Sequence, residues 1–475
     1  MTLHLSRRQF IAMVAGTGAA TLLAACAAPA APTQVPAKPA EAPKPAEAPK
    51  PAATKPAGAA ATGGAFDWKR YRGEKIDVFL TLGPRADQIK AHVAEFQELT
   101  GMTANLEIVP EQQQRQKQVI EFTSGNPSFD VTDVSWHVQK RLFGRAKWLL
   151  PLNDLLKDSS ATSPDFDFAD FAKAATDYAT QSDGRMDTMP QVIDYWILFL
   201  NRDLFEAKGL TPPKTFDDMV AAAKAIHDPA KNVYGFVARG LKNANTPVWT
   251  GFMQGWDKDP VDKDGNLHTA SAEAIEAAKL YQNLMKNYAP PGVSGFNWNE
   301  AQSLFFQGNA GIWYDGIGFA APVEDKTKSK IAGRVLYGLQ PAGPKAQHSA
   351  VFGGGFGIPA STKKPGAAFL FVQWATGKNL QKELLQKGLG APARNSPYQD
   401  SEVLSKLTVP KAWADALVAS GKIGRKGLPE VIPVTEFRDI FGVALTNMIS
   451  GADPKAELER ATAEFKPILE KSEKQ

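Results

Sequence analysis

Residues 75–81 read Lys75-Ile76-Asp77-Val78-Phe79-Leu80-Thr81, with the β-branched and aromatic composition of a buried strand. The segment from Ala86 to Leu99 follows and carries apolar residues at helical spacing. The segment from Thr103 to Val109 again reads as a strand. A strand, a helix and a second strand in this order indicate a parallel α/β unit. We therefore expect an α/β fold at the start of the folded chain.

The rest of the chain continues this pattern. Phe129 to Val134 reads as a further strand, and Tyr195 to Leu200 reads as an apolar strand that crosses the molecule. Thr215, with Asp218 three residues later, predicts the N-terminal cap of a helix. The folded part, from about Ala65 to Gln475, is longer than a usual single domain. We therefore expect two domains.

The first 25 residues have the architecture of an export signal. Arg7 and Arg8 precede an apolar run from Phe10 to Leu23 that is too short for an ordinary transmembrane helix. The run ends at Leu-Ala-Ala-Cys26, which resembles the bacterial lipobox, and the basic start resembles the twin-arginine signal. This resemblance implies cleavage before Cys26 and lipidation of its sulfur, so the mature chain would be anchored to a membrane. Because Cys26 is the only cysteine, no disulfide within the chain is possible.

Residues 26–64 are predicted to form the lipidated cysteine and a tether. Alanine, proline and lysine dominate this segment, which cannot bury enough apolar surface to fold. As an extended polyproline-like spacer it would reach on the order of 100 Å. The whole chain has 54 Lys plus Arg against 50 Asp plus Glu, and removal of Arg7 and Arg8 lowers its net charge from +4 to +2. No basic run is interleaved with aromatic residues, so we expect no nucleic-acid partner.

Several motifs resemble, in order, those of bacterial extracellular solute-binding proteins, family 1, the sugar-binding lipoproteins of ABC importers. They extend over most of the chain from Lys75 to Lys471. They are Thr188-Met189-Pro190, Leu200-Asn201-Arg202-Asp203-Leu204-Phe205, Gly209 to Phe216, Phe305 to Ile312, Gly353 to Ile358, Gly390-Ala391-Pro392-Ala393-Arg394 and Ile449 to Pro454.

The resemblance implies a type II periplasmic binding protein fold, in which two α/β lobes are joined by a multi-strand hinge. It places lobe 1 at residues 65–189 plus 352–394 and lobe 2 at residues 190–350 plus 396–475. The implied function is capture of a carbohydrate or polyol in the cleft between the lobes, for delivery to the membrane subunits of an ABC importer. The implied protein is a monomer without cofactor, held by its lipid at the outer face of the cytoplasmic membrane, in the periplasm if an outer membrane is present.

The candidate ligand-binding residues combine aromatic rings with polar side chains. Sugars present apolar faces ringed by hydroxyl groups, so a sugar site needs flat rings beside hydrogen-bonding groups. The resemblance points to such positions at the crossings and in loops after the predicted strands, with Trp136 in the loop after the Asp130 strand and Trp249 in a loop-like stretch of the second lobe. They are Thr81, Arg85, Trp136, Asp194, Tyr195, Trp196, Trp249, Trp313, Asp315, Gly354 and Arg394. For Trp136, Trp249 and Trp313 a core position is an equal alternative. Asp194 could instead pair with a structural arginine, and Arg394 could be a hinge residue with an ion pair.

Two other functions remain open at this point. The six histidines are scattered and show no metal-ligand spacing, and no nucleophile motif is present, so we predict neither a metal nor catalysis. An exported lipoprotein enzyme acting on glycans would use Asp194 and Asp315 as a carboxylate pair. A receptor that feeds a sensor is a third hypothesis. The chain has Ile317-Gly318-Phe319 where sugar binders often carry a tryptophan, which leaves the identity of the ligand open.

Overall fold

The structure of the chain is a computed structural model that describes residues 65–474. The predicted signal segment, Cys26 and the tether lie outside the described residues. Within residues 65–474, no helix combines the length and the hydropathy that crossing a membrane would need.

The first lobe begins with the predicted strand-helix-strand unit, which the structure confirms. Strand β1 (Lys75–Thr81) pairs in parallel with β2 (Thr103–Val109), from Lys75 opposite Thr103 to Thr81 opposite Val109, and α2 (Pro84–Thr100) connects them. Strand β3 (Val131–Ser135) pairs in parallel with the other edge of β1. The carboxyl ends of β1, β2 and β3 therefore lie at one edge of the sheet, where ligands bind in open α/β sheets.

Helices and short segments cover this sheet and lead to the crossing strand. The apolar residues of β1 are at most 2% exposed, because both of its faces are covered. The elements are α3 (Glu111–Ser124), α4 (Trp136–Ala146), α5 (Asn153–Lys157), the 3₁₀ helices η1 (Pro164–Phe166) and η2 (Phe168–Asp170), and α6 (Lys173–Ala179).

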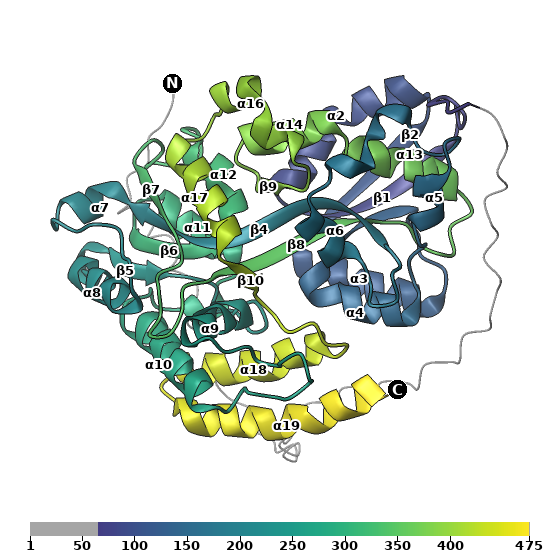
Figure 1. The fold of residues 1–475 in the computed structure, drawn as a ribbon. Coiled ribbons are helices and arrows are strands. Elements are labelled where there is room, and N and C mark those ends of the chain that lie inside the picture. Colours follow the sequence, from purple (N-terminus) through teal and green to yellow (C-terminus); the bar gives the residue numbers. More distant parts are fainter. Residues whose placement is uncertain (1–64, 475) are drawn as a thin grey trace, which may run out of the picture. The chain divides into compact units, whose positions relative to one another are not determined.

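Two long strands run from the first lobe into the second. Strand β4 (Thr188–Asn201) pairs antiparallel with β8 (Ser349–Gly357) over its first half and with β6 (Ala310–Gly316) over its second half. The path through the sheet is β2-β1-β3-β8-β4-β6-β5. Figure 1 shows β4 and β8 passing between the two groups of helices. The fold is thus α/β with two lobes joined by more than one strand, as the sequence predicted.

The second lobe is built around β5 (Tyr234–Val237), β6 and β7 (Val335–Gly338). The predicted cap at Thr215 is confirmed, because its hydroxyl accepts the Asp218 N–H at 3.1 Å and the Asp218 carboxylate accepts the Thr215 N–H at 3.0 Å. The other elements of this section are α7 (Arg202–Glu206), α8 (Phe216–Ile226), η3 (Pro229–Lys231), α9 (Thr246–Met253), η4 (Gln254–Trp256), α10 (Ala272–Asn287), η5 (Val293–Gly295), α11 (Trp298–Phe306), η6 (Ile317–Phe319) and α12 (Ala320–Glu324).

The last part of the chain contributes to both lobes. Helix α13 (Pro365–Ala375) packs on α2 of the first lobe, whereas α18 (Val434–Ile449) and α19 (Pro454–Lys474) pack on α10 of the second. The remaining elements are α14 (Lys378–Gln386), β9 (Ala391–Pro392), α15 (Ser396–Gln399), α16 (Ser401–Ser405), α17 (Lys411–Lys422) and β10 (Gly424–Lys426).

The glycines of β8 allow its two neighbouring strands to approach closely. A Cβ atom on Gly354 would lie 2.8 Å from the Val134 carbonyl oxygen of β3, and one on Gly355 would overlap the Met189 carbonyl oxygen of β4. The glycine-rich motif at Gly353 to Gly355 is therefore explained by backbone packing where the two lobes join.

Candidate binding cleft

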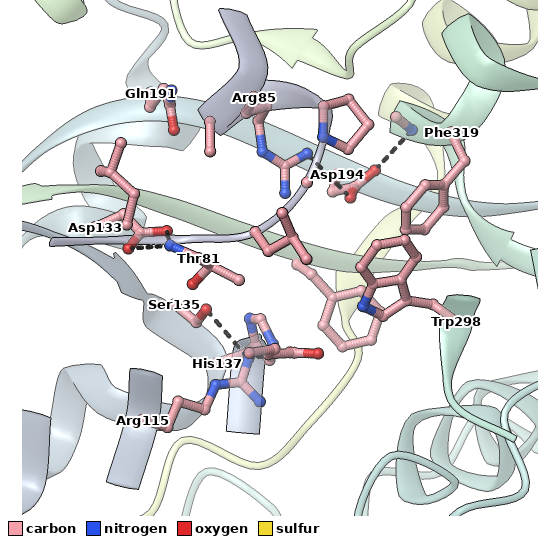
Figure 2. Close-up of a pocket in the computed structure, with 18 of the residues that line it drawn as sticks. Thr81, Arg85, Arg115, Asp133, Ser135, His137, Gln191, Asp194, Trp298 and Phe319 are labelled. Carbon is pink, nitrogen blue, oxygen red and sulfur yellow. Dashed lines mark hydrogen bonds and ion pairs between the residues drawn. The ribbon is translucent and has the colours of Figure 1, made fainter. Parts of the chain in front are cut away.

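A cavity opens where the carboxyl ends of β1 and β3 face the second lobe across β4 and β8. The β1 side contributes residues from Leu80 to Ile89, and the β3 side contributes Asp133, Ser135 and His137. The centres of water molecules can occupy about 150 Å³ of the cavity, which is room for on the order of ten waters. Figure 2 shows Arg115 and His137 on one side of this space and Trp298 with Phe319 on another.

The β1 side of the cleft places Thr81 and Arg85. The turn that precedes α2 passes through Gly83, whose φ of 155° favours glycine. The guanidinium of Arg85 donates from Nη1 to the Leu389 carbonyl oxygen at 3.3 Å and lies 3.7 Å from Asp194 Oδ2. Arg85 therefore spans from α2 to β4 and closes one end of the cavity.

Asp133 lies at the end of β3 and is held by donors from two elements. Its carboxylate accepts the Thr81 N–H at 3.2 Å and the Gln114 Nε2–H at 2.7 Å. Burial raises the pKa of Asp133 to about 6, while the donors of Thr81 and the charges of Arg85 and Arg115 act in the opposite direction. Asp133 is thus an oriented carboxyl group that can accept a hydrogen bond from a ligand hydroxyl.

Asp194 lies on the crossing strand β4, at the floor of the cleft. Its Oδ1 accepts the Gly318 N–H at 3.2 Å, and burial raises its pKa although Arg85 counteracts this. Gly316 faces this carboxyl group so closely that a Cβ atom there would lie 2.9 Å from Asp194 Oδ2. Asp194 is therefore fixed by the backbone of the second lobe and by an arginine of the first.

Aromatic rings form the apolar part of the second-lobe wall. The ring of Trp298 stacks on Phe319, with centroids 5.2 Å apart. The Trp196 ring packs against Phe352 at 5.2 Å, and the guanidinium of Arg239 lies over it at 5.0 Å. These rings supply flat surfaces beside the polar groups, as recognition of a polyhydroxylated molecule requires.

Arg239 is held by the best-formed ion pair of the cleft. Its Nε and Nη2 donate to the two carboxylate oxygens of Asp315 at 2.9 and 2.5 Å, and Asp315 is fully buried. The Gly316 N–H donates to the same carboxylate at 2.7 Å. Asp315 therefore positions Arg239, the residue whose guanidinium lines the cavity.

Arginines from two further helices reach the same cavity. Arg115 of α3 pairs with Glu111 at 2.5 Å and donates to the Ser135 hydroxyl at 3.2 Å. Arg438 of α18 donates to the carbonyl oxygen and the side chain of Asn243, at 3.0 and 3.4 Å. Burial lowers the pKa of Arg438 to about 9, with a further decrease from the charge of Arg115.

Four of the predicted site residues line the cavity: Thr81, Arg85, Asp194 and Trp196. Asp315 is placed behind the wall, where it holds Arg239. Tyr195 precedes Trp196 on β4 and therefore points to the other face, toward Gly421 and Gly424. Gly354 contacts the neighbouring strand, as described above.

The three predicted tryptophan platforms do not line the cavity. Trp136 is the first residue of α4, a correction to the predicted loop, and its indole N–H donates to the Thr188 hydroxyl at 2.8 Å. Trp249 lies in α9, not in a loop, and donates to the Ala274 carbonyl oxygen at 3.0 Å. Trp313 is fully buried and stacks on Phe199 at 4.7 Å. All three lie in the core, because each ring is enclosed by packed helices or strands.

Arg394 also lies away from the cavity wall. Its guanidinium donates to the carbonyl oxygens of Thr376, Asp167 and Phe166 and pairs with Asp170 at 3.3 Å. The side chain is fully buried. This set of partners ties three loops together, which is a structural role.

Several lining residues were not among the predicted site residues, namely Glu111, Arg115, Asp133, His137, Arg239, Trp298, Phe319 and Arg438. Asp133 had a signal, since it ends a predicted strand at the ligand-binding edge. Arg239 and Arg438 had none, because they reach the cavity from a loop and a helix that are far apart in the sequence. Within residues 65–474, no cluster of three or more potential metal-ligating side chains is present.

Comparison with known proteins shows the family. Residues 83–382 match the sequence profile described as "Bacterial extracellular solute-binding protein". The chain belongs to this family. An erythritol/L-threitol-binding protein of Mycolicibacterium smegmatis is 26% identical over 425 residues, which cover 85% of this chain and 87% of that protein. A mannitol-binding protein of Pseudomonas aeruginosa is 23% identical over 382 residues, 74% of this chain and 83% of that protein.

Solved structures of this family share the fold. A solute-binding protein of an ABC transporter from Agrobacterium radiobacter K84, in complex with ribitol, superposes with a TM-score of 0.77 at 24% identity, covering 84% of this chain and 99% of that one. A second solute-binding protein, from Agrobacterium vitis S4 with bound D-mannitol, superposes with a TM-score of 0.74 at 22% identity and covers 84% of this chain and 99% of that one. The fold is that of type II periplasmic binding proteins. The family and these relatives are binding proteins of transport and not enzymes.

Proposed function

We propose that the protein is the receptor of an ABC importer and captures a polyhydroxylated solute, a sugar or polyol, in the cleft between its lobes. The observation that carries this proposal is the cavity itself, in which rings such as Trp196 and Trp298 lie beside Arg85, Asp133 and Asp194. Two relatives are named for binding erythritol/L-threitol and mannitol, and a third was solved in complex with ribitol. These polyols belong to the same class of ligand. A small ligand that enters the cavity would displace the waters for which it has room.

Ligand capture would proceed through closure of the lobes. We propose the lobe boundaries given above, with residues 65–189 plus 352–394 opposite residues 190–350 plus 396–475. A ligand that contacts Asp133 on one lobe and Trp298 on the other binds the closed form better than the open form. Only this difference in affinity shifts the population toward closure. The importer would then recognise the closed shape.

The proposal extends to the position of the protein in the cell. Residues 1–25 would direct export, Cys26 would carry the lipid, and residues 27–64 would tether a monomeric receptor near the outer face of the membrane. Mass spectrometry of the N-terminal peptide tests this directly. Cleavage before Cys26 together with acyl mass on that residue is expected, and an unmodified thiol would contradict the anchor.

Calorimetric titration with a panel of sugars and polyols, with small-angle scattering in parallel, tests the receptor function. Binding together with a decrease in the radius of gyration is expected, and binding without compaction would contradict the closure mechanism. Asp194→Asn is expected to weaken binding about tenfold or more, because the variant loses the charge opposite Arg85. Asp203→Asn is the matched control, since Asp203 pairs with Arg334 at the surface. An Asp194→Asn variant that binds normally but has lost a glycan-cleaving activity would instead favour an enzyme.

A further inference from the structure

The cleft contains arginine N–H groups that have no acceptor in the described part of the chain. Arg115 uses only Nη2, for Glu111 and Ser135, while its Nε and Nη1 are buried without a partner. Arg438 is 5% exposed, and its hydrogen bonds within residues 65–474 all go to Asn243. Buried charged donors without acceptors are costly, so a native protein retains them where a ligand supplies the acceptor.

The charges around these donors nearly balance. Arg115, Arg239 and Arg438 contribute three positive charges to this part of the wall. Glu111 and Asp315 contribute two negative charges, each in an ion pair already formed. Asp133, with a pKa of about 6, is mostly ionised at neutral pH and adds a third negative charge, while the pair of Arg85 with Asp194 adds no net charge, so the site as a whole is close to neutral.

Neither His137 nor Asp133, the other titratable groups nearby, accepts a hydrogen bond from the unpaired donors of Arg115. Burial and the charge of Arg115 lower the pKa of His137 well below its usual value, so its ring is neutral, and its Nδ1 has no partner. The carboxylate of Asp133 is already bonded by Thr81 and Gln114, and no hydrogen bond joins it to Arg115.

The unpaired donors come from both lobes. Arg115 belongs to α3 of the first lobe and Arg438 to α18 of the second. The Gln112 side chain, also on α3, donates to the Asn243 side chain at 2.9 Å, and Asn243 is the residue that holds Arg438. The two arginines thus face one region of the cleft from opposite sides, where like charges repel until an anion lies between them.

We propose that the natural ligand is a polyhydroxylated carboxylic acid, such as an aldonate or a uronate, whose carboxylate lies between Arg115 and Arg438. This inference rests on the proposed receptor function and specifies its substrate class. A carboxylate is favoured over a phosphate monoester, which carries about −1.5 to −2 at neutral pH, because a site without surplus positive charge leaves less charge uncompensated when the ligand's charge is smaller. The planar fork of a guanidinium also matches a carboxylate with two parallel hydrogen bonds. The hydroxyl groups of the ligand then extend toward Asp133 and Asp194, and Trp298 covers its carbon chain.

Calorimetry with the purified full chain and matched pairs of ligands tests this proposal. The pairs are gluconate with glucitol and galacturonate with galactose, and glycerol 3-phosphate represents the phosphate class. At least one acid is expected to bind on the order of 10- to 100-fold more tightly than its neutral partner, because it gains charge-assisted hydrogen bonds. Higher salt should weaken binding of the acid more than binding of the neutral compound.

Variants of Arg438 show whether the preference arises at this position. Arg438→Gln is expected to weaken binding of the acid on the order of tenfold more than binding of its neutral partner, which removes most of the preference. Arg438→Lys keeps the charge without the fork and should retain part of the preference. Arg334→Gln, at an exposed ion pair remote from the cavity, is the matched control and should bind as the wild type does. Circular dichroism and thermal melting establish that each variant is folded.

Each other outcome overturns a defined part of the reasoning. Neutral polyols that bind as tightly as their acids would refute the carboxylate proposal and leave the receptor function intact. Tighter binding of glycerol 3-phosphate than of any carboxylate would refute the choice of a carboxylate over a phosphate. Folded protein that binds neither sugars, polyols nor acids would refute the receptor function as well.

Discussion

Replacement of Asp315 by asparagine tests how much the buried ion pair beneath the cleft contributes to stability. The wild-type carboxylate accepts two hydrogen bonds from Arg239, at 2.9 and 2.5 Å, and one from the Gly316 N–H at 2.7 Å. Asp315 is fully buried, and the Arg239 side chain is 13% exposed. The variant leaves Arg239 without its hydrogen-bonded counter-ion and beside two other arginines, Arg115 and Arg438. Its folded state should therefore lose stability although its shape is almost unchanged.

The expected loss can be worked out from this burial. Removal of one partner from a buried ion pair costs about 3–5 kcal/mol. The 410 residues from 65 to 474, at about 2.1 cal/mol/K per residue, give an unfolding entropy of about 0.9 kcal/mol/K. The melting temperature should therefore decrease by about 4–6 °C.

Differential scanning calorimetry and urea unfolding of the purified protein measure this loss. The control is Asp203→Asn, which breaks an Asp–Arg pair of similar length, 2.7 Å, whose side chains are 42% and 53% exposed. Exposed pairs contribute about 0–1 kcal/mol, so the control should melt within about 1 °C of the wild type. Equal losses in Asp315→Asn and Asp203→Asn would refute the reasoning, since burial would then make no difference.

Three further predictions concern the fold. Gly355→Ala should destabilise the protein by about 2 kcal/mol or more in urea unfolding, because the added Cβ overlaps the Met189 carbonyl oxygen; Gly295→Ala, with open space around its Cβ, should not, and equal effects would contradict the packing argument. Burial raises the pKa of Asp187 from 3.8 to about 6. Between these two pH values the native state holds a proton that the unfolded state has lost. The free energy of unfolding should therefore fall as pH rises through this window, by up to about 3 kcal/mol. The free energy of unfolding of the wild type minus that of Asp187→Asn, measured from pH 4 to 7, should fall in the same way. A difference that does not change with pH would disprove the titration of Asp187. Thr215→Ala should cost about 1 kcal/mol by loss of the helix cap, with Thr215→Ser largely restoring it in the same assay; a loss of the same size in both variants would rule out the cap as its cause.

The sequence indicated much of the fold, because local patterns encode it. The unit from β1 to β2, the cap at Thr215 and the crossing strand β4 each follow from periodicity or from turn chemistry within a few residues. The motifs of the solute-binding family then implied two lobes. These are statements about neighbours in the chain and their order, which a sequence displays directly.

The cleft was predicted less completely. Thr81 and Arg85 could be located because they follow a strand whose carboxyl end faces ligands, and Asp194 and Trp196 because they lie on the crossing strand. The large rings of Trp136, Trp249 and Trp313 suggested a sugar platform, but the same rings also fill a core well, and composition cannot separate the two uses.

The sequence by itself therefore determined the α/β fold class, the two-lobed architecture and the chemical type of the groups that could bind a solute. The tertiary structure decided which of those groups meet. Arg115, Arg239 and Arg438 are separated by well over 100 residues along the chain, yet all three reach one cavity. Their common location depends on how α3, the loop after β5 and α18 pack across the join between the lobes. Such long-range packing leaves no periodic signal in the sequence, because it depends on the shapes of surfaces that exist only after folding.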